Sequence, residues 1–238
     1  MTDIYKQIIQ SKTEAKKLLA ILLDPDKIDW EDFELLIAKI NLSPATHIFI
    51  GGSEVKTNRI DELISSLKQK VNLPMVLFPG NPSQISSQAD AILFLSLISG
   101  RNSDYLIEHQ VKAAAILKAT QLEVISTGYM LIESGAETAV GRVSKTTALD
   151  RNNLDLALAT AQAGEMLGSK LIYLEAGSGA RLTVPVKMIE LIAQNIEIPL
   201  IVGGGIVSLR DIQKAYDAGA DLVVIGTAFE NNPDFFVK

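Results

Sequence analysis

The chain contains no cysteine among its 238 residues, so disulfide bonds, thiolate catalysis and cysteine-based zinc sites are excluded. It has only two histidines, His47 and His109, which argues against a His-rich metal site and a Ser/His/Asp triad. Positive charge is also scarce, because 22 Lys and Arg stand against 28 Asp and Glu and the formal net charge is -6. Nucleic-acid-binding proteins normally present a basic face to phosphates, so we expect no nucleic-acid partner.

Long apolar runs are missing as well. No stretch approaches the ~18 to 20 uninterrupted apolar residues that span a bilayer, and residues 1–17 lack the apolar core of a signal peptide. We therefore expect a cytoplasmic protein with no integral membrane segment. Hydrophobic residues nevertheless make up 47% of the chain, and its mean hydropathy is +0.23. An apolar substrate groove or a subunit interface would account for this value.

Short apolar runs that end in turn residues recur along the chain and predict strands. These runs do not alternate between apolar and polar residues, as expected for strands buried on both faces of a parallel sheet. Amphipathic segments between them predict helices. The expected strands are 18–23, 47–50, 75–78, 91–95, 123–126, 171–175, 200–202 and 221–225, and the expected helices are 30–40, 58–70, 103–119, 152–167, 186–194 and 208–217.

Eight strand–helix units of this size predict an α/β fold, a single (β/α)8 TIM barrel over residues 1–238. The third unit is irregular, because only residues 79–90 separate two strands. Pro79 and Pro82 leave room there for no more than a short helix. We expect a shortened or non-helical connection after the third strand. A doubly wound open sheet is the alternative fold.

Glycine-bearing turns follow three consecutive strands, at 177–179, 203–205 and 226–227. In a (β/α)8 barrel, the residues directly after each strand gather at one end, where active sites are built. Glycine lets backbone N–H groups approach an anion closely, and a helix N-terminus adds favourable partial positive charge. The sequence therefore predicts a phosphate site at the last three strands, with ordinary turn chemistry as the alternative.

Acidic residues also stand at strand ends. Glu175 ends an apolar strand directly before the Gly-Ser-Gly turn, where a carboxylate with the usual pKa of ~4.3 could accept a proton from a substrate hydroxyl. Asp24 and Ser53 follow the first two strands and offer oxygens to Mg²⁺, which needs few protein ligands when phosphate and water supply the rest. A structural Glu175 and a turn-forming Asp24 are the alternatives. For Asp26 we favour a turn or cap role.

Together these segments resemble the geranylgeranylglyceryl phosphate synthase family, over nearly the whole chain. The resemblance implies transfer of a polyprenyl group from an isoprenoid diphosphate, such as geranylgeranyl diphosphate, to the C3 hydroxyl of sn-glycerol 1-phosphate. It also implies Mg²⁺ as cofactor and diphosphate as second product. The matching segments are L-L-D-P-D-K at 22–27, G-G-S at 51–53, T-G-Y at 127–129, Y-L-E-A-G-S-G at 173–179, I-V-G-G-G-I at 201–206 and G-T at 226–227.

Carried over by position, the resemblance implies that Asp24 and Ser53 bind Mg²⁺ and that Glu175 is the base. The segments 128–133 and 142–145 are similar to the branch found in bacteria and some archaea, but assign no role to Tyr129, Arg142 or Lys145. The residues implied to hold glycerol phosphate are Tyr173, Leu174, Glu175, Ala176, Gly177, Ser178, Gly179, Gly204, Gly205, Gly226 and Thr227.

A long prenyl chain needs an apolar groove, and the segments 91–98 and 113–117 offer suitable side chains, although such residues are mostly core in a barrel. Apolar residues on helix faces lead us to expect a homo-oligomer. Two other functions remain open. One is a phosphate-binding TIM-barrel sugar-phosphate isomerase or synthase, which would pair Asp24 with Glu175. The other is a non-catalytic phosphate-binding scaffold.

Overall fold

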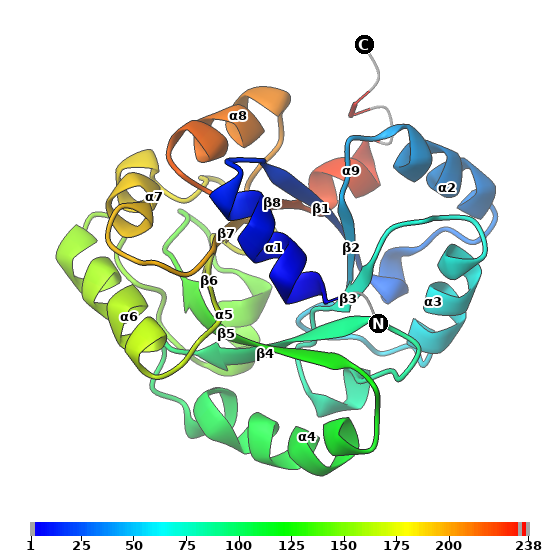
Figure 1. Cartoon of the computed structure of the whole chain (residues 1–238), viewed down its shortest axis with the longest axis horizontal. Helices are drawn as coiled ribbons and strands as arrows, with labels where there is room; N and C mark the ends of the chain where they lie inside the picture. Colours follow the sequence, from blue (N-terminus) through cyan, green and yellow to red (C-terminus); the bar gives the residue numbers. More distant parts are fainter. Residues whose placement is uncertain (1–2, 233–234, 237–238) are drawn as a thin grey trace.

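The computed structural model describes residues 3–232 and 235–236. Eight parallel strands pair in chain order, and β8 pairs with β1, so the sheet closes into a barrel (Figure 1). The predicted fold class is therefore confirmed. The strands are β1 Leu18–Leu23, β2 His47–Ile50, β3 Met75–Leu77, β4 Ala91–Leu97, β5 Glu123–Leu131, β6 Leu171–Glu175, β7 Leu200–Gly203 and β8 Leu222–Ile225.

Helices form a ring around the barrel (Figure 1). The six predicted helices correspond to α2, α3, α4, α6, α7 and α8. None of the helices in the described residues is long and apolar enough to cross a membrane. The bounds are α2 Phe33–Leu42, α3 Ile60–Lys68, α4 His109–Lys118, α5 Ala139–Ser144, α6 Leu154–Met166, α7 Val186–Ala193, α8 Leu209–Asp217 and α9 Thr227–Asn231.

Strand β5 is longer than the sequence predicts. The expected strand ended at Ser126, but pairing continues with β4 at Thr127 and with β6 as far as Leu131. Thr127 and Gly128 are residue types typical of turns. The neighbouring strands β4 and β6 nevertheless pair with the backbone here and satisfy its hydrogen-bonding groups. This extension carries Tyr129 into the barrel interior.

The connection between β3 and β4 contains one 3₁₀ turn, Pro82–Gln84, and no longer helix within residues 78–90. This confirms the expected shortened connection. The Asn81 side chain caps the turn by accepting a hydrogen bond from the Ser83 N–H at 2.9 Å. The outer helical layer is therefore incomplete beside β3 and β4.

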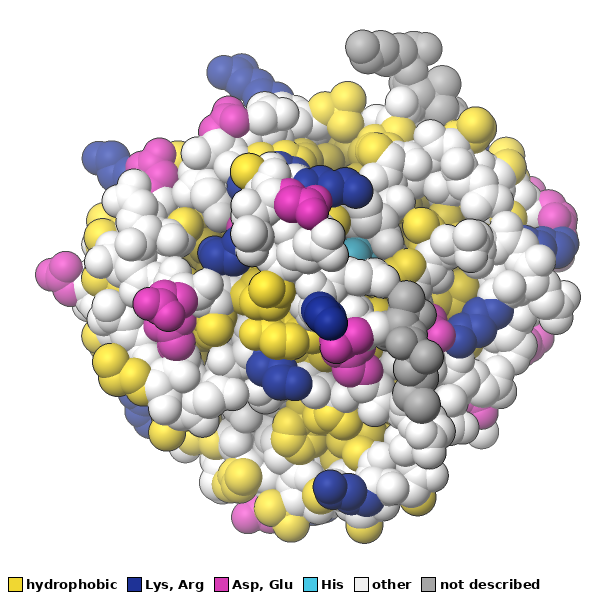
Figure 2. Space-filling model, viewed as in Figure 1, with side chains coloured by type: hydrophobic (Ala, Val, Ile, Leu, Met, Phe, Trp, Pro, Cys, Tyr) yellow, Lys and Arg dark blue, Asp and Glu magenta, His cyan; other side chains and the backbone are white. Residues whose placement is uncertain are grey.

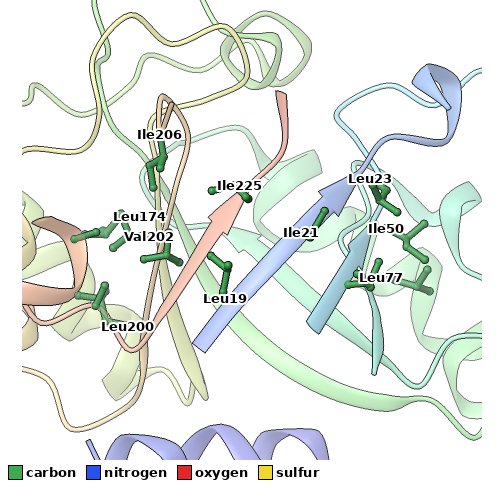
Figure 3. Close-up of a cluster of buried hydrophobic side chains, with 14 of the residues drawn as sticks. Leu19, Ile21, Leu23, Ile50, Leu77, Leu174, Leu200, Val202, Ile206 and Ile225 are labelled. Carbon is green, nitrogen blue, oxygen red and sulfur yellow. The ribbon is translucent and has the colours of Figure 1, made fainter. Parts of the chain in front are cut away.

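Side chains of the strands divide between two cores, because successive residues of a strand point to opposite faces. The outward-facing set packs between barrel and helices, and part of it is drawn in Figure 3, including Leu19, Ile21 and Leu174. The inward-facing set fills the barrel and includes Phe49 and Tyr173. On β6 this alternation points Leu174 outward and its neighbours inward.

Helix α1, Ile4–Thr13, closes the N-terminal end of the barrel and crosses its centre in Figure 1. Ile4 and Ile8 are 0% and 2% exposed and belong to the interior cluster. The Glu123 carboxylate at the start of β5 accepts hydrogen bonds from the Ile4 and Tyr5 N–H groups at 2.6 and 3.0 Å. The polar N-terminal segment thus supplies a plug that the sequence analysis did not predict.

We expect Ile8→Ala to lower the free energy of unfolding by about 2 to 5 kcal/mol, because it removes a buried side chain and leaves a cavity. Exposed Gln7 on the same helix is the matched control, and Gln7→Ala should change the stability by no more than about 0.5 kcal/mol. Urea unfolding of both variants measures the difference. Equal stability of the two would show that α1 does not plug the barrel.

On the face that α1 covers, Lys and Arg side chains are scattered among acidic ones and do not gather into a basic patch (Figure 2). Hydrophobic side chains show between them.

Candidate active site

The C-terminal ends of the strands surround a cavity that is partly open to solvent, which we call the mouth cavity. Two of the predicted site residues do not line it, since the Leu174 side chain packs in the outer core and Ala176 is fully buried. The predicted residues that do line it are Asp24, Ser53, Tyr173, Glu175, Gly177, Ser178, Gly179, Gly204, Gly205, Gly226 and Thr227.

Glu175, at the end of β6, is only 6% exposed. Its Oε1 accepts a hydrogen bond from the Gly177 N–H at 2.6 Å. Burial raises the pKa of Glu175 to about 7, although the Gly177 N–H and the Tyr173 hydroxyl act in the opposite direction. The expected pKa of ~4.3 is therefore wrong, because the sequence does not show how completely the barrel desolvates this carboxylate. A carboxyl group titrating near neutral pH suits proton transfer.

Three aromatic rings form the surroundings of this carboxylate. Phe78 stacks on Tyr173 with ring centroids 5.2 Å apart, and Tyr129 meets Tyr173 edge-on at 5.3 Å. Burial, reinforced by the nearby Glu175 carboxylate, raises the pKa of both tyrosines well above its ordinary value. Both phenols therefore stay neutral beside Glu175.

The raised pKa of Glu175 has a consequence for stability. Between the ordinary value of 4.5 and about 7, the folded protein binds the proton more tightly than the unfolded chain does. The free energy of unfolding therefore falls as the pH rises through this window. We expect Glu175→Gln to remove this dependence and to be more stable than the wild type by about 3 kcal/mol above pH 7.

Denaturant unfolding of the wild type and Glu175→Gln between pH 4 and 8 measures this effect. The matched control is Glu54→Gln, which changes an exposed carboxylate of the mouth cavity. That control should stay within about 0.5 kcal/mol of the wild type at each pH. A wild-type stability that does not fall between pH 4.5 and 7 would contradict the burial of an ionised Glu175.

The glycine turns are packed so closely that side chains would not fit. Gly204 has a φ of +80°, and a Cβ there would overlap Oε1 of Glu175 and stand 2.5 Å from the Gly177 nitrogen. Gly177 has a φ of +96°, and a Cβ there would overlap the Thr138 side chain. Within the described chain, the N–H groups of Gly204 and Gly205 have no acceptor. These donors are available to an anion in the mouth cavity.

Asp24 has the turn-forming role that was the alternative from the sequence, and it also lines the mouth cavity. Its Oδ1 accepts the Asp26 N–H at 3.1 Å and so caps the 3₁₀ turn Pro25–Lys27. Its Oδ2 faces the cavity beside Gly52, where a Cβ would stand 3.2 Å away. Burial raises the pKa of Asp24. Asp24 is half-buried and lines the mouth cavity, so its carboxylate is accessible to a ligand there.

Asp26 lies in the turn after β1, as expected, but Asp24 and not Asp26 caps that turn. The Asp26 carboxylate accepts hydrogen bonds from the Lys56 and Thr57 N–H groups at 2.7 and 2.9 Å. It thereby joins the end of β1 to the loop after β2. The exposed Arg142 and Lys145 line no part of the mouth cavity.

The donors around Asp24 fit Mg²⁺ only in part. Asp24 and Ser53 offer the hard oxygen atoms that this ion prefers. In the part of the chain that the structure describes, no three His, Cys, Asp or Glu side chains come together as a complete metal site. A bound Mg²⁺ would therefore take most of its ligands from phosphate and water, as is usual for this ion.

A second cavity adjoins the mouth cavity and is lined mainly by apolar side chains, so we call it the apolar groove. It occupies the side of the barrel where the short β3–β4 connection leaves the helical layer incomplete. Both cavities share Gly52, Ser53, Phe78, Tyr129 and Val140. The groove therefore lies directly beside the candidate active site.

The groove contains part of the segments expected from the sequence, namely 92–95, Leu97 and Ala113. Leu117 instead packs in the outer core. The sequence analysis missed Tyr105 and His109, whose rings meet edge-on at 4.7 Å in the groove wall. In the sequence, their segment has only the pattern of an amphipathic helix. This pattern does not distinguish residues that line a groove from residues of the core.

Comparison with known proteins decides the family. The model of the PcrB family matches residues 9–238. The chain belongs to the PcrB family. A geranylgeranylglyceryl phosphate synthase of Flavobacterium johnsoniae is 71% identical over 236 residues, which cover 99% of this chain and 97% of the relative. The resemblance found in the sequence is thereby confirmed.

Solved structures agree with this membership of the PcrB family. The crystal structure of (S)-3-O-geranylgeranylglyceryl phosphate synthase from Thermoplasma acidophilum, in complex with its substrate sn-glycerol-1-phosphate, has a TM-score of 0.91. It is 33% identical, and the match covers 98% of this chain and 93% of that one. An N-acetylmannosamine-6-phosphate 2-epimerase from Clostridium perfringens, with a TM-score of 0.56 and 14% identity, shares the fold alone.

Proposed function

We propose that this chain is a Mg²⁺-dependent prenyltransferase that joins a geranylgeranyl or other polyprenyl group to the C3 hydroxyl of sn-glycerol 1-phosphate. One observation carries the proposal. Glu175, a buried carboxylate with a pKa of about 7, lies in a cavity that has glycine turns at β6, β7 and β8 and that adjoins an apolar groove. The substrate and the name of the relatives described above support the same reaction.

Glycerol phosphate fits the side of the mouth cavity near β6, β7 and β8. Gly204 and Gly205 line that side and have backbone N–H groups without an acceptor among the described residues, and Gly226 and Thr227 line the same cavity. A phosphate bound to them would lie close to Glu175, since a Cβ at Gly204 would overlap its carboxylate. The C3 hydroxyl would then be held within reach of the base, and such positioning lowers the barrier to reaction.

The prenyl donor fits the opposite side of the cavity. Its hydrocarbon tail would lie in the apolar groove, and its diphosphate would lie where groove and mouth cavity meet, at Gly52 and Ser53. Asp24 and Ser53 would hold Mg²⁺ there. When bound, this ion supplies positive charge that neutralises the departing diphosphate.

In the reaction, Glu175 accepts the proton of the C3 hydroxyl. The hydroxyl oxygen forms a bond to C1 of the prenyl group, and the bond between C1 and diphosphate oxygen breaks. Diphosphate leaves with the electron pair of that bond. The neutral phenols of Tyr129 and Tyr173, with the Phe78 ring, exclude water that would otherwise compete for C1.

The proposal is tested with radiolabelled sn-glycerol 1-phosphate, geranylgeranyl diphosphate and Mg²⁺, followed by extraction into organic solvent. Label should enter the organic phase only when enzyme and both substrates are present, and sn-glycerol 3-phosphate serves as the matched acceptor. Label that stays in water with every donor length would contradict the proposal. A cytoplasmic location, one domain over 1–238 and assembly into homo-oligomers stay predictions.

A further inference from the structure

Lys27 is the one Lys or Arg that lines the mouth cavity or the apolar groove in the described chain. It ends the 3₁₀ turn that follows β1. Its Nζ lies 3.2 Å from Oε2 of Glu230 on α9 and 3.7 Å from Oδ2 of Asp24. The ammonium group therefore connects the end of β1 with the helix after β8, at the rim of the cavity.

The fixed charges of the mouth cavity have the wrong sign for two anionic substrates. Its lining includes the carboxylates of Asp24, Glu54, Glu175 and Glu230, against the single ammonium of Lys27. A prenyl diphosphate and glycerol phosphate bring further negative charge into the same space. One Mg²⁺ leaves much of this negative charge uncompensated. The position of the Lys27 ammonium therefore decides which of the two substrates this cation stabilises.

Contacts at the cavity floor indicate which substrate this is. The head group of a donor whose tail fills the groove would lie at Gly52 and Ser53, which belong to both cavities. Gly52 is next to Asp24, because a Cβ on Gly52 would stand 3.2 Å from Oδ2 of Asp24. The Lys27 Nζ lies 3.7 Å from the same carboxylate oxygen.

We propose that Lys27 binds the diphosphate of the prenyl donor and remains paired with it as it leaves. This assignment rests on the proposed function. The Lys27 side chain is 46% exposed, so it can move from Glu230 to a ligand without opening the core. An ammonium group offers phosphate oxygens a compact charge with three N–H donors. When the C1–oxygen bond breaks, this charge stabilises the electron pair that diphosphate takes.

Isothermal titration with inorganic diphosphate at fixed Mg²⁺ tests the assignment without turnover. We expect Lys27→Met to weaken diphosphate binding at least about tenfold and Lys27→Arg to restore most of it. Binding of sn-glycerol 1-phosphate to Lys27→Met should stay within about threefold of the wild type. Glu230→Gln keeps the ammonium and removes a repelling carboxylate, so it should bind diphosphate at least as tightly as the wild type.

The thermal unfolding of each variant shows whether it is folded. Unchanged diphosphate binding by Lys27→Met would overturn the assignment, and so would a loss confined to sn-glycerol 1-phosphate. Diphosphate affinity could also fall as far in Glu230→Gln as in Lys27→Met. That result would show that the Lys27–Glu230 ion pair matters and not a contact of Lys27 with diphosphate, and it would likewise overturn the assignment. If diphosphate binding depends on Lys27 but the protein transfers no prenyl group, the proposed function is contradicted and the assignment of Lys27 stands.

Discussion

Replacing Glu175 by glutamine is expected to lower kcat by about 10²- to 10⁴-fold, the usual contribution of a general base. Glutamine has nearly the same shape, and its carbonyl oxygen can still accept the Gly177 N–H that Glu175 accepts at 2.6 Å. It does not take up the proton of the C3 hydroxyl. The glycine N–H groups that would hold the phosphate are unaltered, so sn-glycerol 1-phosphate should bind as it does to the wild type.

Single-turnover rates measure the chemical step, and titration with sn-glycerol 1-phosphate measures binding. The matched control is Glu54→Gln, another carboxylate of the mouth cavity that is exposed and lies on a different strand end. A turnover of Glu175→Gln close to that of the wild type would mean that another group accepts the proton. Equal losses in the two variants would point to the overall charge of the cavity instead of a base.

The wild-type pH profile follows from the same carboxylate. Since the pKa of Glu175 is about 7, we expect kcat/KM to fall about tenfold per pH unit below that value, as the base becomes protonated. This acidic limb belongs to the free enzyme. The phenols of Tyr129 and Tyr173, whose pKa burial raises further, stay neutral throughout the measured range.

Asp24→Asn has the second-largest expected effect. We expect the Mg²⁺ concentration for half-maximal activity to rise at least about tenfold, because a neutral amide binds this ion more weakly than a carboxylate. The amide oxygen can still accept the Asp26 N–H that Oδ1 of Asp24 accepts at 3.1 Å, so the turn after β1 is kept. The loss should therefore concern the metal and not the fold.

Activity measured against Mg²⁺ concentration checks this expectation, with Glu54→Gln again as the control. The Asp24→Asn activity should recover in part at high Mg²⁺. A curve that coincides with that of the wild type would show that other groups hold the ion. A shift of the same size in Glu54→Gln would show a general charge effect.

The sequence predicts the barrel well because its strands are short apolar runs that end in turns. Strand 171–175 has the same limits in the prediction and in the structure. Prediction fails where tertiary contacts decide. The polar first segment becomes a helix because two isoleucines on one of its faces fill the barrel end, and β5 passes Gly128 because strands on both sides pair with it.

The sequence predicts which residues line the mouth cavity better than it predicts the physical properties of those residues. Asp24, Ser53 and Glu175 are found at strand ends, and the structure brings them to one cavity. The pKa of Glu175 depends on rings from β5, β6 and the β3–β4 connection, which no local pattern reveals. Lys27 follows Asp24 in a short turn, and only its ion pair with α9 shows that it belongs to the cavity rim.

The central claim is that the C3 hydroxyl oxygen of sn-glycerol 1-phosphate, deprotonated by Glu175, attacks C1 of the prenyl group. Acceptor labelled with ¹⁸O at the C3 hydroxyl tests this claim most directly, with both products analysed by mass spectrometry. The account predicts that all of the label appears in the ether oxygen of the lipid product and none in the released diphosphate. Label in the diphosphate, or a lipid product without it, would contradict the account.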